Sequence, residues 1–430
     1  MFFLIIVLVI GINVAPFIFD KMDMWTAQGL WVQMCSVAIL SYMFFEKKKY
    51  TVSNSSLALM FAWLSYITFY RVYKSYTGGL HEKMQQLFER QEFLTREVAQ
   101  YVQLFKVVQN VIYTLAPYLN FFCLLIIYLA VTEYLSRVEI KKIMVVMKYT
   151  IIFTLLTCVL QKFFLTGNTA AQFFRLLIKQ SNFNEFHNNL VTGFLSNGTH
   201  LSGFLASCAP LFFWRMKRVD VLSLILMVII LWSCSTTIGD PSISGYVILA
   251  LSFLFFYKTK KLIIPLIILF WGVICLAGEY LPPQFWSFHG RFDTWQRWWP
   301  IFMKLPMTGH GLGTVNILSK DLANSQLHLG VAAMNVTTRH LHLEYFQVMV
   351  ETGVIGLCFV LNMVHKFFIT YAQDRTELAL KTMVFGFLLS CLFTYPAHLW
   401  LPSSWAMITY ASFVALRREN YGVQPQRIKR

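Results

Sequence analysis

Long runs of apolar residues dominate the chain and are separated by short polar links. A helix needs about 20 apolar residues to cross a bilayer, so the runs predict about twelve spanning helices. These helices cover residues 2–19, 25–45, 55–73, 109–132, 143–163, 191–214, 219–235, 242–257, 262–279, 343–365, 378–395 and 399–416. The pattern therefore predicts an all-α, polytopic integral membrane protein.

The longest polar stretch divides the predicted helices into two groups. Residues 1–279 carry nine predicted helices, residues 280–342 form a large outer loop, residues 343–416 carry three more helices, and residues 417–430 form a basic tail. Another connection, at 74–108, has apolar residues at helical spacing between charged ones. We expect it to form an amphipathic helix on the outer membrane face.

Composition agrees with the membrane class. The 430 residues are 57% hydrophobic and 13% charged, whereas a soluble surface is about 25–35% charged. The 17% of aromatic residues exclude a disordered chain. All eight cysteines lie in or at the end of apolar runs without a Cys-x-x-Cys pair. This pattern predicts reduced thiols with no disulfide or zinc role.

The net charge of +16 raises the question of a nucleic-acid partner. Most of the 36 lysines and arginines lie in short links and in the tail, all on one side of the predicted topology. The positive-inside rule makes that side cytoplasmic and places both termini in the cytoplasm. The charge is therefore explained by membrane orientation, and no nucleic-acid partner is expected.

The sharpest candidate for chemistry lies at the end of the outer loop, where Arg339, His340 and His342 precede the tenth predicted helix. If that helix begins by Thr338, Arg339 and His342 share a face. A nearby cation disfavours the imidazolium, so a neutral His342 could act as a general base on a hydroxyl group. The alternative is an interfacial histidine bonded to a carbonyl group or lipid phosphate. Histidines two residues apart diverge on a helix, so no metal is expected.

A second candidate lies upstream in the same loop. Arg291 and Arg297 flank Trp295, a combination that can hold a diphosphate through forked donors while an aromatic ring stacks on a sugar. The alternative is a pair of arginines at the level of the lipid headgroups. Gly311 and Gly313 follow and can bring backbone N–H groups close to an anion, or can simply form a tight turn.

A third stretch, residues 192–203, places Asn197 and His200 among glycines and serines inside a predicted span. Polar residues are costly in hydrocarbon, so they should face a cavity or another helix. Lining of a substrate cavity and close helix packing both explain this composition.

These stretches resemble the O-antigen ligase and O-antigen polymerase family of bacterial membrane glycosyltransferases, over roughly residues 190–365. The motifs are Gly-Arg-x-x-x-Trp from Gly290, His-x-x-Tyr-x-Gln from His342, and an element from Gly193 to His200. The resemblance implies a glycan donor linked to undecaprenyl diphosphate. It implies a hydroxyl group of a lipid A-core sugar or of another lipid-linked repeat as acceptor, at the periplasmic side of the inner membrane. No metal, nucleotide or other cofactor is implied.

By the same resemblance, Arg291 contacts the donor diphosphate, and His342 is the base or positions the acceptor. We expect the remaining site residues to bind substrate: Arg339, Arg297, His340, Gly311, Gly313, Trp295, Asn197 and His200. One departure is Ser244, which stands where many relatives have an arginine. Arg297, Arg339 and Arg175 are the candidates to replace that arginine, and the division between ligase and polymerase stays open.

Two other classes of function are compatible with the sequence. A transporter or flippase of lipid-linked or polar solutes fits the number of predicted helices, and it predicts functional polar groups near the bilayer midplane. A non-catalytic envelope scaffold predicts that Arg291 and His342 are dispensable.

Overall fold

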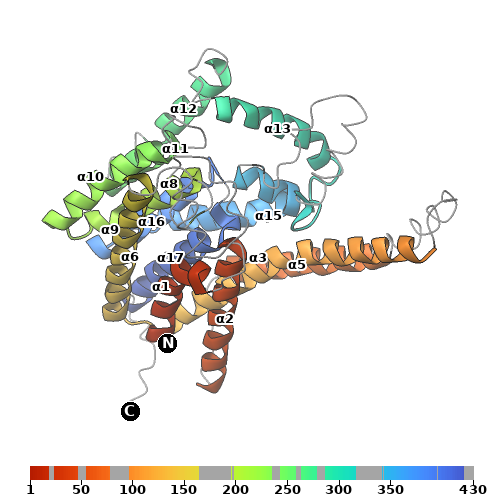
Figure 1. Cartoon of the computed structure of the whole chain (residues 1–430), viewed down its shortest axis with the longest axis horizontal. Coiled ribbons are helices and arrows are strands. Elements are labelled where there is room, and N and C mark those ends of the chain that lie inside the picture. Colours follow the sequence, from red (N-terminus) through yellow and green to blue (C-terminus); the bar gives the residue numbers. More distant parts are fainter. Residues whose placement is uncertain are drawn as a thin grey trace. The chain divides into compact units, whose positions relative to one another are not determined.

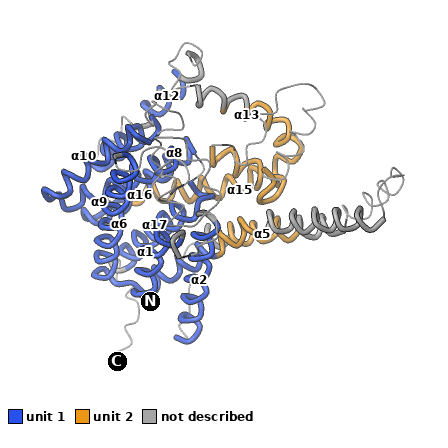
Figure 2. Tube along the Cα trace, in the orientation of Figure 1, with its two compact units in different colours: residues 1–50, 123–289, 371–430 blue, residues 51–122, 290–370 orange. Residues whose placement is uncertain are grey.

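The chain is described here from a computed structural model. It describes residues 1–18, 24–46, 55–77, 96–163, 195, 198–234, 243–257, 263–277, 286–315, 341, 343–394 and 396–420. All regular elements within these ranges are helices, so the all-α prediction is confirmed. The chain forms two compact units (Figure 2): residues 1–50, 123–289 and 371–430 make unit 1, and residues 51–122 and 290–370 make unit 2.

Several helices have the length and composition of membrane spans. Within the described residues, four of them are long and apolar enough to cross a bilayer: Thr26–Phe45, Leu115–Tyr134, Arg137–Lys162 and Glu344–Ile369. Shorter apolar helices cover Phe2–Ala15, Leu59–Tyr70 and Ile243–Phe256. These features support association with a membrane, while the count of about twelve spans stays a prediction.

Unit 1 contains most of the described helices, and Figure 1 labels the α-helices among them. They are α1 (Phe2–Ile18), α2 (Met24–Phe45), the end of α5 (Arg96–Tyr134), α6 (Arg137–Phe163), α8 (Gly198–Cys208), α9 (Pro210–Phe213), α10 (Arg218–Ser233), α11 (Ile243–Phe256), α12 (Ile263–Ala277), α16 (Arg375–Ser390), the 3-10 helix η6 (Pro396–His398) and α17 (Trp400–Asn420). α8 packs against α11 and α16 and is buried over nearly its whole length.

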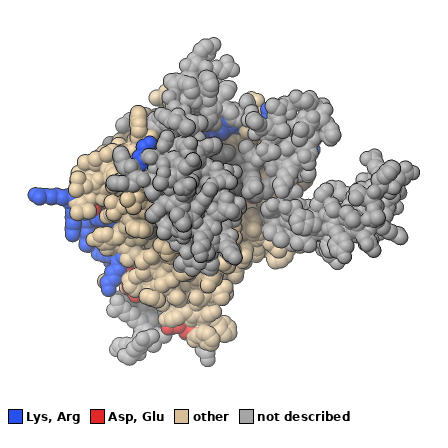
Figure 3. All heavy atoms as spheres, viewed as in Figure 1, with Lys and Arg blue, Asp and Glu red and all other residues tan. Residues whose placement is uncertain are grey.

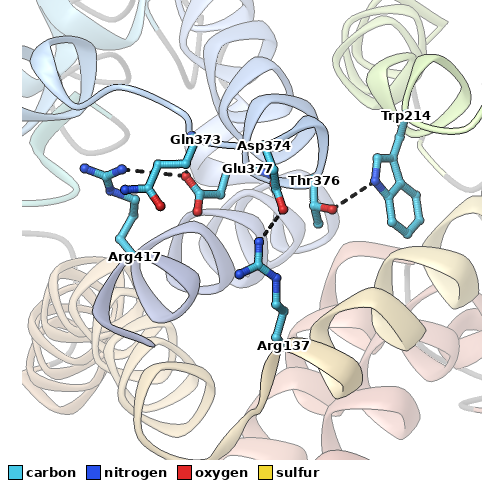
Figure 4. Close-up of polar contacts among 7 residues, drawn as sticks. All are labelled: Arg137, Trp214, Gln373, Asp374, Thr376, Glu377 and Arg417. Carbon is cyan, nitrogen blue, oxygen red and sulfur yellow. Dashed lines mark hydrogen bonds and ion pairs between the residues drawn. The ribbon is translucent and has the colours of Figure 1, made fainter. Parts of the chain in front are cut away.

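Helix ends that the sequence places on one membrane side meet in unit 1. The ion pairs between them are Arg137–Asp374, Arg417–Glu377, Arg418–Glu133 and Lys148–Asp220, and the first two are drawn in Figure 4. The first three join the ends of α5, α6, α16 and α17, and the fourth joins Lys148, inside α6, to Asp220 in the first turn of α10. The alternation of the chain across a membrane and the compartment that these ends face stay predictions.

Unit 2 is built from α3 (Ser55–Thr77), the first part of α5, α13 (Trp286–Phe302) from Gly290 onward, and α15 (Glu344–Ile369). A hydrophobic cluster joins α13 to α15 through Trp298, Phe302, Val315, Leu341, Phe346 and Val350. A second cluster packs Leu312 against Leu64 and Ile67 of α3. Both clusters hold the segments that follow α13 against the rest of the unit.

One predicted boundary and one assumed helix start are wrong. The structure begins α5 at Arg96, so residues 96–108 belong to one helix of 39 residues with the predicted fourth span. At about 1.5 Å per residue, this helix is longer than a bilayer core is thick. In addition, α15 begins only at Glu344, because its N-cap residue Leu343 has extended backbone angles (φ −147°, ψ 101°). The condition that this helix begins by Thr338 is therefore not met, and the shared face predicted for Arg339 and His342 lies outside the described residues.

Candidate functional site

The predicted site residues fall into three groups. Arg291, Trp295, Arg297, Gly311 and Gly313 are described in unit 2, whereas His200 lies in unit 1. The remaining members lie outside the described residues: Asn197, Arg339, His340 and His342. Because His340 and His342 are among these, the absence of a metal there stays a prediction.

α13 aligns Arg291 with the buried face of unit 2. Arg291, Trp295 and Trp298 are spaced four and three residues apart, so they lie on one side of the helix. Trp298 is buried in the cluster with α15, and Trp295 packs against it. Arg291 is partly buried, and burial lowers the pKa of its guanidinium to about 10. The group therefore stays charged at neutral pH in surroundings where an ionic contact is stronger than in water.

Leu341, the residue before His342, is held by side chains from two helices. Its carbonyl oxygen accepts a hydrogen bond from Trp295 Nε1 at 2.8 Å, and its backbone N–H donates to Gln347 Oε1 at 3.1 Å. The other end of the Gln347 amide donates from Nε2 to Glu351 Oε1 at 3.2 Å. We call Trp295, Gln347 and Glu351 the Leu341 clamp. It ties Leu341 and the start of α15 to the helix that carries Arg291.

The glycine-rich turn after α13 forms hydrogen bonds with backbone groups at a break in α15. The break is at Gly353, which has φ 71° and ψ −177°. Three carbonyl oxygens before it accept hydrogen bonds from outside the helix: Val350 from His310 N at 2.9 Å, Glu351 from Gly311 N at 2.8 Å, and Thr352 from Trp63 Nε1 at 3.2 Å. In an apolar setting such pairing is obligatory, because each unsatisfied backbone group costs several kcal/mol.

The glycines of this turn are required by backbone geometry. Gly309, Gly311 and Gly313 all have positive φ angles, between 69° and 95°. A Cβ atom on Gly309 would lie 2.4 Å from the backbone nitrogen of Gly353. The backbone N–H of Gly311 donates to Glu351, which favours the tight-turn alternative at this position.

α15 also carries buried acidic groups that the sequence analysis did not propose for the site. Glu344 is 4% exposed and Glu351 is 3% exposed, with Gln347 between them at 2%. Their spacing of three and four residues places all three on one face. These two carboxyl groups could have been predicted as site residues from the sequence, because ionisable residues inside membrane segments are rare and usually functional.

His200 lies in α8, where small residues allow helices to approach closely. A Cβ atom on Gly245 of α11 would lie 2.9 Å from Cβ of Ser202 in α8, and one on Gly386 of α16 would lie 2.8 Å from Cα of Ser207. His200 and Ser244 are both buried, at 4% and 2% exposure. These contacts favour the helix-packing alternative for the part of residues 192–203 that the structure describes.

Comparison of the chain with protein-family models, curated proteins and solved structures finds no match. The resemblance to O-antigen ligases and polymerases therefore rests on the sequence motifs alone.

Proposed function

We propose that the protein transfers a glycan from undecaprenyl diphosphate to an acceptor hydroxyl group, in the manner of O-antigen ligases and polymerases. The acceptor is a lipid A-core sugar or another lipid-linked repeat, and the reaction takes place at the periplasmic side of a bacterial inner membrane. The protein is multi-pass, with both termini in the cytoplasm.

The observation that carries this proposal is the Leu341 clamp. Trp295 ends one motif of the resemblance, and Gln347 ends another. The two side chains bind the carbonyl and the N–H group of the same buried residue, although they are 52 positions apart in the sequence. If Arg291 and His342 act on one substrate, the helix with Arg291 and the segment before His342 must be held together, because catalysis depends on fixed geometry. The hydrogen bonds to Leu341 supply such a link.

The chemistry assigned to these residues is a single displacement. The acceptor hydroxyl oxygen attacks the anomeric carbon, and the bond from that carbon to the diphosphate oxygen breaks. His342 takes the hydroxyl proton, and undecaprenyl diphosphate leaves with its bonding electron pair. The partly buried cation of Arg291 stabilises the negative charge that develops on the leaving group.

The test is a glycan-transfer assay with the purified full-length protein and a lipid-linked donor. We expect Arg291→Ala to lower the transfer rate at least about a hundredfold, the scale of losing one preorganised electrostatic contact. Arg291→Lys should retain part of the activity, because it keeps the charge but loses the forked donors. The matched control is Lys304→Ala, which removes an exposed cation of the same unit. An Arg291→Ala variant that folds and works at the wild-type rate would overturn the assignment. In a separate test of metal dependence, the wild-type protein is expected to keep full activity in excess EDTA.

A transporter or flippase is the second candidate function. It is favoured by the break in α15 at Gly353, beside the buried Glu351, because broken helices with polar groups are typical of transport sites. The same assay separates the two candidates. A transferase yields a glycan covalently joined to the acceptor, whereas a transporter moves the donor across a vesicle membrane and leaves it unchanged.

A further inference from the structure

A cationic cleft opens on unit 1, where the residues after α9 meet the start of α16. Its volume is about 530 Å³, and it is open to the surroundings. Its lining includes Trp214, Arg215, Lys217, Asp374, Arg375 and Thr376. None of these residues belongs to the candidate glycan site, so the cleft needs its own explanation.

The floor of the cleft is fixed by hydrogen bonding and packing. Trp214 and Thr376 are both buried, and the indole Nε1 of Trp214 donates to Thr376 Oγ1 at 3.1 Å (Figure 4). The guanidinium of Arg215 lies over the Trp214 ring, 4.7 Å from its centroid. This contact holds the Arg215 cation at the mouth of the cleft.

The charge of the cleft is strongly positive. Its one acidic side chain, Asp374, already pairs with Arg137 and accepts a hydrogen bond from the backbone N–H of Glu377 at 2.8 Å. Arg215, Lys217 and Arg375 are exposed, and within the described ranges none of them forms an ion pair. Figure 3 shows lysine and arginine side chains gathered at the edge formed by α9 and α10. The cleft is therefore suited to an anion.

An apolar surface begins directly beside these cations. Met216 is 49% exposed, and Val219, Leu222, Ile225 and Ile229 of α10 are 50–66% exposed. Their spacing of three to four residues gives α10 one continuous apolar face. A soluble phosphate compound has no apolar part that could contact this face. A phospholipid has acyl chains that can cover it.

We propose that this cleft binds the phosphate headgroup of an anionic phospholipid, whose acyl chains lie along the exposed face of α10. The three cations neutralise the phosphate, and the ring of the buried Trp214 holds Arg215 in position. The site is independent of the proposed glycan transfer.

Native mass spectrometry of the purified full chain in neutral detergent tests this site with three probes. We expect phosphatidylglycerol to bind with one tight site and phosphatidylcholine with the same acyl chains to bind much more weakly. Glycerol 1-phosphate supplies the free phosphate without acyl chains. If it binds as tightly as phosphatidylglycerol, the ligand is a soluble phosphate compound and the proposal is overturned.

Substitutions of the cleft cations test whether the lipid binds at this cleft. The double substitution Arg215→Gln/Arg375→Gln should raise the Kd for phosphatidylglycerol about thirtyfold, because each cation near an anionic lipid contributes about 1 kcal/mol and 1.4 kcal/mol corresponds to tenfold. Lys217→Gln alone should raise it about fivefold by the same rule. The control Lys142→Gln/Lys304→Gln removes two exposed cations outside the cleft and should leave the Kd unchanged. Equal Kd values for all variants, or equal losses in the cleft and control variants, would refute the location.

Discussion

Replacement of Trp295 by phenylalanine tests the Leu341 clamp with little change in packing. The substitution keeps a large aromatic ring against the α13–α15 cluster but removes the indole N–H that donates to the Leu341 carbonyl oxygen at 2.8 Å. Leu341 has no solvent exposure, so water cannot replace the lost donor. An unsatisfied buried carbonyl costs about 1–3 kcal/mol, and a shift of the adjacent segment relieves that cost.

Such a shift moves the residue that follows Leu341, which is His342. A displacement of about 1 Å in a catalytic group lowers a rate by about a hundredfold. We therefore expect Trp295→Phe to lower kcat for glycan transfer at least about tenfold with little change in KM, because the substrate-binding groups remain. The thermal unfolding midpoint should fall only slightly.

The matched control is Trp299→Phe on the same helix. Trp299 is 51% exposed and stacks on Phe346 with centroids 6.4 Å apart, a contact that phenylalanine can keep. Wild-type kcat in Trp295→Phe would refute the view that the clamp positions the reacting group. Equal losses in both variants would show that the helix surface matters only for packing.

Two further predictions concern stability. Gly353→Ala should lower the thermal unfolding midpoint, because φ 71° with ψ −177° is a conformation that costs a side chain about 1–3 kcal/mol. Its Cβ would also lie 2.1 Å from the Met307 carbonyl oxygen. The control is Gly272→Ala, where a Cβ meets nothing within 4 Å, and it should not lower the midpoint. Burial opposes ionisation of Asp374, but hydrogen bonds from the Glu377 backbone and Arg137, together with the Arg137 charge, hold its pKa below the ordinary value. The Asp374–Arg137 contribution to stability is therefore present above the unfolded pKa of about 3.9 and is lost as pH falls through the lower folded value. Asp374→Asn should destabilise the protein at pH 7 and reduce the loss of stability on acidification, and equal pH profiles in thermal melts of the two proteins would contradict this.

The sequence predicted helices where apolar runs are long, since period and length decide those elements locally. The predicted start of the tenth span at residue 343 agrees closely with the start of α15 at Glu344. The assumed earlier start, at Thr338, was wrong for a reason that is not local. The N–H and carbonyl groups of Leu341 bond to the side chains of Gln347 and Trp295 and so are diverted from helical pairing.

The candidate site was predictable in part. Arg291 and Trp295 stood out as a cation and an aromatic ring close together in a predicted loop, and the structure places both on one side of the helix α13. The pairing of Trp295 with Leu341 spans 46 positions, and no periodicity in one sequence specifies such a contact. The role of Gly311 as a donor to Glu351 depends on the break at Gly353, which becomes visible only when the two segments meet.

The central claim is that Arg291 and the segment held by the Leu341 clamp act together on a lipid-linked diphosphate. The most direct measurement is the amount of glycan joined to acceptor by the purified full-length protein, by Arg291→Ala, by His342→Ala and by Lys304→Ala. The account predicts covalent product from the wild type and Lys304→Ala, and at least about a hundredfold less product per unit time from the other two variants. Wild-type product levels from folded Arg291→Ala and His342→Ala would contradict it.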